Sequence, residues 1–241
     1  MNFKIVPIAG DASFRKFYRL FLNKKSKIII STQKDKYKNL FAYVAINNFL
    51  RKNGILTPKL IDYNYTKGLI AIEDFGDKTF YQILLKQKNK LVIYKRLVDL
   101  LLKIQKIKPK KKIKNINSKF YIIKKYTSKH LLEESNLFFD WYLPLFLSKK
   151  KSLIIKKKSN KTLLRLYKKL DSSKSCFVHR DYHVQNLMHV GKRIGVIDTQ
   201  DALIGHPAYD LVSLIDDVRI QTSIKLKKEI YKYYLKKNPK I

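Results

Sequence analysis

The feature that most constrains this chain is an ordered set of polar residues between short apolar segments. His179-x-Asp181 is followed by Asn186, and twelve residues later by Asp198, which directly follows the apolar segment 194–197. A phosphoryl-transfer site needs a carboxylate to orient and deprotonate the accepting hydroxyl. It also needs an Asn and a second Asp to hold magnesium against the nucleotide phosphates. The spacing therefore predicts a catalytic loop followed by a hairpin that ends at a metal ligand.

Each of these residues has a predicted role that follows from its chemistry. Asp181 is the predicted catalytic base, which must reach the accepting hydroxyl. Asn186 offers a neutral oxygen and Asp198 a charged one, the hard ligands that magnesium prefers beside phosphate oxygens. The structural alternatives are a loop cap for Asn186 and a surface turn for Asp198. His179 is expected to organise the loop through backbone hydrogen bonds, and Arg180 to pair with a nearby carboxylate.

Length and composition bound the class of protein. A chain of 241 residues that is 45% apolar can bury a full core, as one domain or as two lobes sharing a cleft. No apolar run approaches the ~20 residues that span a bilayer, and the one in residues 1–9 is too short for a signal-peptide core. Cys176 cannot form an internal disulfide and is expected to be a small buried filler. We expect a cytoplasmic monomer without membrane insertion.

The formal net charge of +35 has two interpretations. A surface that binds nucleic acid or an anionic membrane would carry such a charge. However, the positive residues are mostly lysines spread over every segment, and arginine, the preferred reader of phosphates and bases, is scarce. This pattern favours codon bias toward A and T, so no specific nucleic-acid partner is predicted.

Residues 1–77 are predicted to form a sheet lobe that ends in a hinge. Alternating apolar and polar residues indicate strands, and one segment with helical periodicity stops at Asn53-Gly54. The strands are expected at residues 3–8, 16–22, 27–31, 60–65 and 69–72, and the helix at residues 40–50. Residues 73–77 close this lobe.

Residues 78–241 are predicted to form a helical lobe that carries the catalytic and metal-binding loops. Helices are expected at residues 80–85, 91–107, 120–129, 137–146, 163–170, 208–218 and 226–235. Strands return only around the catalytic residues, at 177–178, 187–190 and 194–197, and residues 106–117 are expected to be a loop. The fold class is therefore α+β, a two-lobed protein-kinase-like plan with a small antiparallel sheet and an active site at the lobe junction.

Several short blocks of this sequence resemble a known family. They read GDASFR at 10–15, EDFGD at 73–77, FDWY at 139–142, DTQDA at 198–202 and PAYD at 207–210. With the catalytic block, they resemble the aminoglycoside phosphotransferase and choline kinase superfamily. The branch they resemble is the bacterial anomeric kinases, which phosphorylate N-acetylmuramate and N-acetylglucosamine at the C1 hydroxyl in cell-wall recycling. The match runs from about residue 8 to residue 217.

The resemblance implies ATP and Mg²⁺ as cofactors and gives roles to residues outside the catalytic block. The turn before the second strand would cover the nucleotide phosphates through Ser13, Phe14 and Arg15. Glu73 and Phe75, at the entry to the helical lobe, would present backbone groups to the adenine ring. This turn is not a glycine-rich loop, and an ordinary hairpin turn would need the same residue types. A plain hairpin turn is therefore the structural alternative.

The same resemblance implies roles for three more polar residues. Asp201 would contact the sugar or the metal shell, with a helix cap as the alternative. Asp210 would be the buried aspartate that bonds the backbone of the catalytic loop, a structural role. His183 stands where related protein kinases place a lysine that faces the transferred phosphate, so it would stabilise that charge or else pack.

Two departures from the family pattern are visible. Related kinases place a phosphate-binding lysine on the third strand and pair it with a helix glutamate. Here that strand ends Ile28-Ile29-Ile30-Ser31, and the helix at residues 40–50 has no acidic residue. Arg15, Lys16 or Lys34 would have to substitute. In addition, 24 residues follow Asp217, whereas relatives continue with helices that build the sugar pocket, so a shortened homologue or a fragment is expected.

The leading prediction is an ATP- and Mg²⁺-dependent kinase acting on a sugar hydroxyl, with the anomeric position of N-acetylmuramate or N-acetylglucosamine as the acceptor. One alternative is an aminoglycoside- or choline-type kinase, whose cationic acceptors would need an acidic pocket. Carboxylates are scarce after Asp140 outside the catalytic block, which disfavours that alternative. A non-catalytic pseudokinase that binds nucleotides or nucleic acid is a third.

Overall fold

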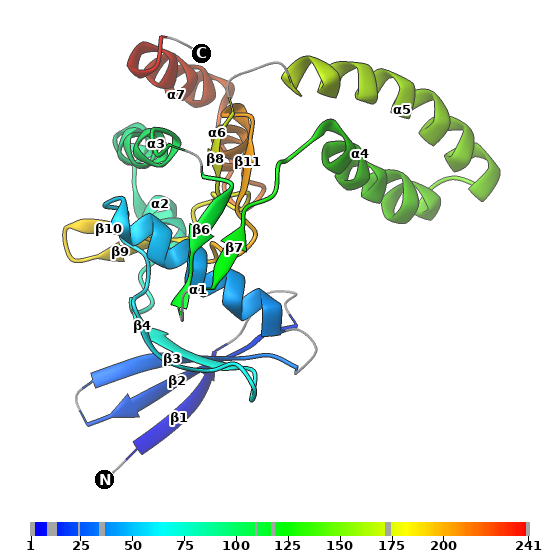
Figure 1. The fold of residues 1–241 in the computed structure, drawn as a ribbon. Coiled ribbons are helices and arrows are strands. Elements are labelled where there is room, and N and C mark those ends of the chain that lie inside the picture. Colours follow the sequence, from blue (N-terminus) through cyan, green and yellow to red (C-terminus); the bar gives the residue numbers. More distant parts are fainter. Residues whose placement is uncertain are drawn as a thin grey trace.

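The computed structural model of the protein describes residues 3–8, 14–23, 25–33, 37–108, 110–116, 119–171 and 175–239. The first part is an antiparallel sheet of five strands in the order β1-β2-β3-β5-β4, with one helix beside it (Figure 1). The elements are β1 Phe3–Ile8, β2 Lys16–Leu22, β3 Lys25–Ser31, α1 Tyr37–Lys52, β4 Leu60–Asn64 and β5 Leu69–Glu73. All five predicted strands and the helix are confirmed, with small shifts at their ends.

Helix α1 packs on the sheet through one face. The buried side chains of Leu40, Tyr43 and Val44 meet Ile30 of β3 and Ile70 of β5. Ile30 and Ile70 are register partners on neighbouring strands, so their side chains share the face that α1 covers. This small core fixes the sheet against the helix that precedes the rest of the chain.

The turn between β4 and β5 requires a glycine. Gly68 has a φ of +65°, and a Cβ atom there would lie 2.4 Å from the carbonyl oxygen of Thr32. The close approach serves a backbone hydrogen bond, because Thr32 N–H donates to Gly68 O at 2.9 Å. A side chain at this position would separate the two segments.

The second part is mainly helical, with short strands around the catalytic residues. Its helices are α2 Phe80–Lys86, α3 Lys90–Gln105, α4 Ser128–Leu137, α5 Lys149–Asp171, α6 Ala208–Ile215 and α7 Ile224–Lys237. Its strands are β6 Lys112–Lys114, β7 Phe120–Ile122, β8 Cys176–Val178, β9 Leu187–Val190, β10 Arg193–Val196 and β11 Leu203–Gly205. Three two-stranded antiparallel ladders result, β6 with β7, β9 with β10, and β8 with β11. The predicted α+β, kinase-like fold class is confirmed.

Several element predictions in this part are wrong, and β11 is a strand that the sequence did not predict. Residues 120–129 are not one helix, because β7 pairs with β6 from the segment predicted as a loop, and α4 begins only after Thr127, which forms a capping box. Residues 137–146 form a π-helical turn, Phe138–Tyr142, and a 3-10 turn, Leu143–Leu145, which contains a proline that cannot donate in a continuous helix. The segment 163–170 is only the second half of α5.

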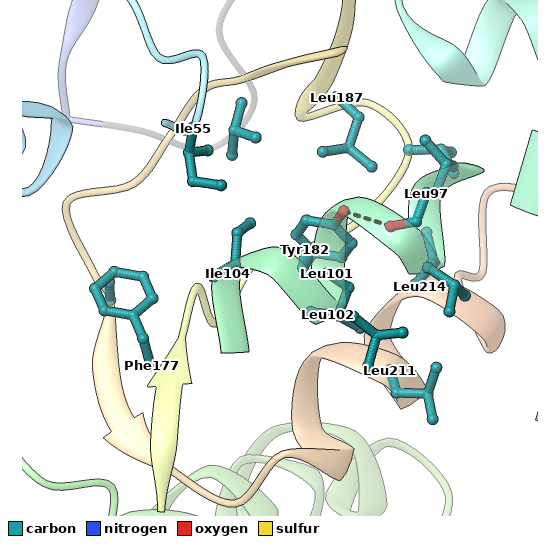
Figure 2. Packing of buried hydrophobic residues seen from close by; sticks show 14 of the residues in the cluster. Ile55, Leu97, Leu101, Leu102, Ile104, Phe177, Tyr182, Leu187, Leu211 and Leu214 are labelled. Atoms are coloured by element: carbon teal, nitrogen blue, oxygen red, sulfur yellow. Dashed lines mark hydrogen bonds between the residues drawn. The ribbon is translucent and has the colours of Figure 1, made fainter. Parts of the chain in front are cut away.

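Helix α3 is the centre of the large core (Figure 2). Its buried Leu97, Leu101 and Leu102 pack among side chains from β8, the catalytic loop and α6. Tyr182, in the loop itself, is fully buried and its hydroxyl donates to the carbonyl oxygen of Leu97 at 2.8 Å. The catalytic loop is therefore part of the core rather than an appendage on it.

Helices α4 and α5 form a hairpin that projects from the body of the protein (Figure 1). The connection between them exposes Trp141, Leu145 and Phe146, each at least two-thirds exposed. Cys176 is buried as predicted, and burial raises the pKa of its thiol to about 12.

Within the described ranges, none of the helices combines the length and the apolar character that crossing a membrane requires.

Removing the hydroxyl that joins the loop to α3 should weaken the fold modestly. Tyr182→Phe keeps the packing and loses one buried hydrogen bond, so the free energy of unfolding should fall by about 1 kcal/mol. The control Tyr142→Phe alters a half-exposed ring and should stay within about 0.5 kcal/mol of the parent. Urea denaturation followed by circular dichroism measures both, and equal values for the two variants would contradict the proposed anchoring.

Candidate functional site

The catalytic loop lies between β8 and β9, and the β9–β10 hairpin returns the chain to Asp198. Asn186 connects the loop, since its Nδ2 donates to Asp181 O at 3.1 Å and lies 3.2 Å from His183 Nε2. Ile197 N–H, one residue before Asp198, donates to Asn186 O at 3.1 Å. The structure thus brings together Asp181, His183, Asn186 and Asp198, which the sequence analysis placed in one site. The amide nitrogen of Asn186 serves the loop, and its oxygen is the atom that a metal would use.

The environment of Asp181 favours a carboxylate that takes up a proton readily. Burial raises the pKa of Asp181, and the neighbouring negative charge of Asp198 raises it further. Burial also lowers the pKa of His183, which keeps its imidazole neutral. A neutral His183 contributes less to phosphate binding than a lysine would. In the structure His183 contacts Asn186 within the loop, and its role toward the phosphate stays a prediction.

A buried carboxylate holds the start of the loop. Asp210 of α6 is fully buried, and its two oxygens accept from His179 N–H at 2.7 Å and Arg180 N–H at 2.9 Å. Burial raises the pKa of Asp210 to about 7, although the two N–H donors favour the charged form. His179 Nε2 lies 3.0 Å from the carbonyl oxygen of Ile197, which links the loop to the hairpin. These contacts support the structural roles predicted for His179 and Asp210.

The side chain of Arg180 is anchored on α4. Its Nε and Nη2 donate to Glu134 Oε1 at 3.2 and 2.6 Å, which confirms the predicted pairing with a carboxylate. The hydroxyls of Tyr126 and Tyr209 donate to the other oxygen of Glu134. Burial and these neighbours raise the pKa of Tyr126, so its hydroxyl stays protonated and donates. Sequence reasoning missed Glu134, because it lies 46 residues from Arg180 in a helix with no distinctive motif.

Arg15 reaches the metal-binding position from the sheet. Its Nη2 lies 2.9 Å from Asp198 Oδ1, and its side chain is only 9% exposed. Phe14 is described and half-exposed, whereas the predicted Ser13 and the substitute candidate Lys34 lie outside the described residues. A buried guanidinium next to Asp198 places a fixed positive charge at the predicted metal site.

The predicted adenine contacts lie between the two parts of the chain. Glu73 Oε2 accepts from Lys59 N–H at 3.1 Å and lies 3.5 Å from Arg51 Nη1. Phe75 packs on the β9–β10 hairpin, since a Cβ atom added to Gly195 would lie 2.6 Å from its ring. The backbone N–H of Glu73 donates to Lys59 O at 2.8 Å. The adenine contact expected of Glu73 and Phe75 stays a prediction.

Asp201 is tied to Asp198 by the residue between them. Gln200 Nε2 donates to Asp198 Oδ1 at 3.0 Å and to Asp201 Oδ2 at 2.9 Å. The segment is also fixed to α1, because Thr199 Oγ1 donates to Asn47 Oδ1 at 2.8 Å. Sequence reasoning did not assign Gln200, although it stands inside the DTQDA block.

A cavity of about 410 Å³ adjoins Asp201. Its wall includes Arg180 and Gln200 from the site, and Lys124, Glu133 and Glu134 from the neighbouring α4 region. A second cavity, of about 720 Å³, lies behind it between the α4–α5 hairpin and α6. The smaller cavity is the one that shares residues with the catalytic loop.

The protein groups available for a metal ion are few and hard. Asn186 and Asp198 offer one amide and one carboxylate oxygen, and no group of three His, Cys, Asp or Glu side chains suited to a metal is found among the residues described. Mg²⁺ in phosphate-transfer sites is held by one or two carboxylates together with substrate phosphates and water. The donor set therefore fits Mg²⁺ bound with a nucleotide.

The fold and the loop define the class of kinase-like phosphotransferases, and solved structures with the same fold agree. An ADP-bound aminoglycoside phosphotransferase, APH(2'')-Ib, superposes with a TM-score of 0.72 at 16% identity over 98% of this chain and 78% of that chain. The choline kinase LicA from Streptococcus pneumoniae gives a TM-score of 0.65 at 13% identity, over 96% of this chain and 74% of that chain. The profile of the phosphotransferase enzyme family matches residues 4–240. The chain belongs to this family.

Relatives with closer sequences share one name. The N-acetylmuramate/N-acetylglucosamine kinase of Neisseria meningitidis serogroup B is 26% identical over 223 residues, which cover 91% of this chain and 63% of the relative. The protein of that name from Caulobacter vibrioides is 26% identical over 205 residues, 83% of this chain and 56% of the relative. The chain thus spans less than two-thirds of the length of these relatives.

Removing Glu134 should loosen the catalytic loop. In Glu134→Ala, Arg180 and two tyrosine hydroxyls lose their shared acceptor, so the free energy of unfolding should fall by about 1–2 kcal/mol, given the partial exposure of the pair. The matched control is Glu133→Ala, whose exposed side chain makes only a 4.0 Å pair with Lys129 and should have almost no effect. Urea unfolding of both variants measures the difference. Equal stability would show that the α4 anchor does not hold the loop.

Proposed function

We propose that this chain carries an ATP- and Mg²⁺-dependent kinase site that transfers the γ-phosphate to a hydroxyl of a small sugar. The carrying observation is the convergence of Asp181, Asn186 and Asp198 on one loop and one hairpin, held by Asp210. The names of the relatives make N-acetylmuramate or N-acetylglucosamine the proposed acceptor. The resemblance of the sequence blocks to the anomeric kinases makes the C1 hydroxyl the proposed position.

Asp181 is the base in this proposal. Its carboxylate accepts the proton of the sugar hydroxyl as the oxygen attacks the γ-phosphorus and the bond to the bridging oxygen of ADP breaks. The raised pKa of Asp181 brings the carboxylate closer to the basicity that proton transfer near neutral pH favours. Asn186 and Asp198 would hold Mg²⁺, which neutralises charge on the phosphates.

Arg15 is the proposed replacement for the missing third-strand lysine. The guanidinium is already placed by its contact with Asp198 Oδ1, on the sheet side of the site. Arginine keeps its charge and offers several N–H donors, so it can hold Asp198 and a phosphate oxygen together. Lys16 is a weaker candidate for this role, because its side chain is exposed on β2.

The cavity of about 410 Å³ is the proposed acceptor pocket, because Asp201 and Arg180 line it beside the catalytic loop. Its volume is sufficient for a single sugar ring. Lys124 in its wall is a cation suited to the carboxylate that distinguishes N-acetylmuramate from N-acetylglucosamine. A free sugar and ATP as substrates are consistent with the proposed cytoplasmic location and monomeric state.

One observation favours a second candidate function. Glu133, Glu134 and Asp201 bring three carboxylates to the same cavity, more than the sequence analysis expected for the acceptor side. Such a wall would suit a cationic amino-sugar or amino-alcohol acceptor. However, Glu134 is neutralised by Arg180, and Lys124 adds a positive charge to the same wall, so Asp201 and Glu133 are the carboxylates left for a cationic acceptor.

The acceptor proposal predicts a defined product. With ATP and Mg²⁺, the purified protein should convert N-acetylglucosamine or N-acetylmuramate to the sugar 1-phosphate, and the methyl glycosides should not react because their C1 oxygen is blocked. Phosphorus NMR locates the phosphate, and kanamycin and choline serve as competing acceptors. Phosphate on C6, or on kanamycin or choline in preference to both sugars, would contradict the proposed acceptor and leave the kinase chemistry standing.

A further inference from the structure

Gln200 is a buried polar residue, 2% exposed, between the two carboxylates that follow β10. Its Nε2 donates to Asp198 Oδ1 at 3.0 Å and to Asp201 Oδ2 at 2.9 Å. Ionised carboxylates only accept hydrogen bonds, so the amide nitrogen of Gln200 must face them. This requirement fixes the direction of the whole carboxamide, and with it the position of the remaining atom, Oε1.

The oxygen of this carboxamide lacks a hydrogen-bond donor. Gln200 Oε1 is buried and has no hydrogen-bond partner in the described part of the chain. A buried carbonyl oxygen without a donor is unfavourable, and such groups are normally completed by protein, water or a ligand. Gln200 lies in the wall of the 410 Å³ cavity together with Asp201 and Arg180. The oxygen is closed off from that cavity, so the carboxamide acts on the site through its nitrogen.

The segment that carries Gln200 is held on both sides. Thr199, its neighbour, is fully buried and donates to Asn47 Oδ1 at 2.8 Å, which fixes the segment to α1. Ala202 N–H donates to Thr199 O at 3.1 Å, which closes the turn after Gln200. Asp198 Oδ1 accepts from both Arg15 and Gln200. Because both donors bind Oδ1, the other oxygen of Asp198, Oδ2, is the one proposed to bind the metal ion.

We propose, building on the kinase function proposed above, that Gln200 is a positioning residue of the acceptor site. Its nitrogen ties Asp201, on the acceptor side, to Asp198, on the metal side. The single carboxamide thereby sets the separation between the accepting hydroxyl and the phosphate that the metal holds.

The first test is Gln200→Leu, which keeps the approximate volume and removes both polar atoms. The KM for N-acetylglucosamine should rise by about tenfold, because Asp201 on the acceptor side loses the hydrogen bond that holds it. More ADP should be released per sugar phosphate, because a misplaced sugar lets water compete for the phosphate. The affinity for Mg-ADP, measured by calorimetry, should change by less than about threefold, since Asn186 and Asp198 remain. Gln87→Leu, an exposed glutamine far from the site in sequence, is the control.

The second test separates positioning from simple packing. Gln200→Met keeps the length and approximate volume of the side chain and removes both polar atoms, so it should show the same rise in KM and the same extra release of ADP as Gln200→Leu. A Gln200→Met or Gln200→Leu protein with the parent KM and the parent ratio of ADP to sugar phosphate would overturn the inference.

The parent protein distinguishes failure of this inference from failure of the proposed function. If it phosphorylates kanamycin but neither amino sugar, the proposed acceptor is wrong. The role of Gln200 is then tested by measuring the KM for kanamycin and the ratio of ADP to phosphorylated kanamycin in Gln200→Leu. If it transfers phosphate to none of them, the kinase proposal fails. Gln200 is then judged by saturation-transfer NMR of N-acetylglucosamine with Mg-ADP. Binding that Gln200→Leu weakens supports the inference, and absent or unchanged binding overturns it.

Discussion

The carboxylate of Asp210 is fully buried, and both of its oxygens accept hydrogen bonds from the backbone of the catalytic loop. Arg180, one of the two donors, has a φ of +80°, a conformation that a residue with a side chain adopts only when its surroundings impose it. Asp181 follows directly, so its direction is set by this backbone. The position of the proposed base therefore depends on a carboxylate that never meets the substrate.

Further contacts extend this control to distant segments of the chain. Glu134 on α4 holds the side chain of Arg180, and Asn47 on α1 holds Thr199 beside Asp198. Arg15 adds a charge from the sheet to the same Asp198. Elements from the first part, the middle and the end of the chain thus meet around two carboxylates. Such a site is preorganised before any nucleotide arrives, which is what electrostatic catalysis of phosphate transfer requires.

The local part of this arrangement was predictable from sequence, and the long-range part was not. The β9–β10 hairpin and the loop residues follow from motif spacing, because they lie within twenty residues of one another. Residues 120–129 look helical by their apolar spacing, but pairing of β7 with β6 overrides that preference. Nothing in the sequence links Glu134 to Arg180 or Arg15 to Asp198, since each contact joins residues that only the fold brings together.

The central claim is that Asp181 acts on the accepting hydroxyl while other residues hold the nucleotide. It is tested most directly by comparing phosphate transfer to N-acetylglucosamine in the parent protein and in Asp181→Asn, with Mg-ATP affinity measured by calorimetry on both. The claim predicts that transfer falls by about a hundredfold or more, as expected for loss of a general base, while the affinity for Mg-ATP changes little. Transfer at the parent rate by a folded Asp181→Asn protein would contradict the claim, as would a loss of Mg-ATP binding that fully accounts for the lost activity.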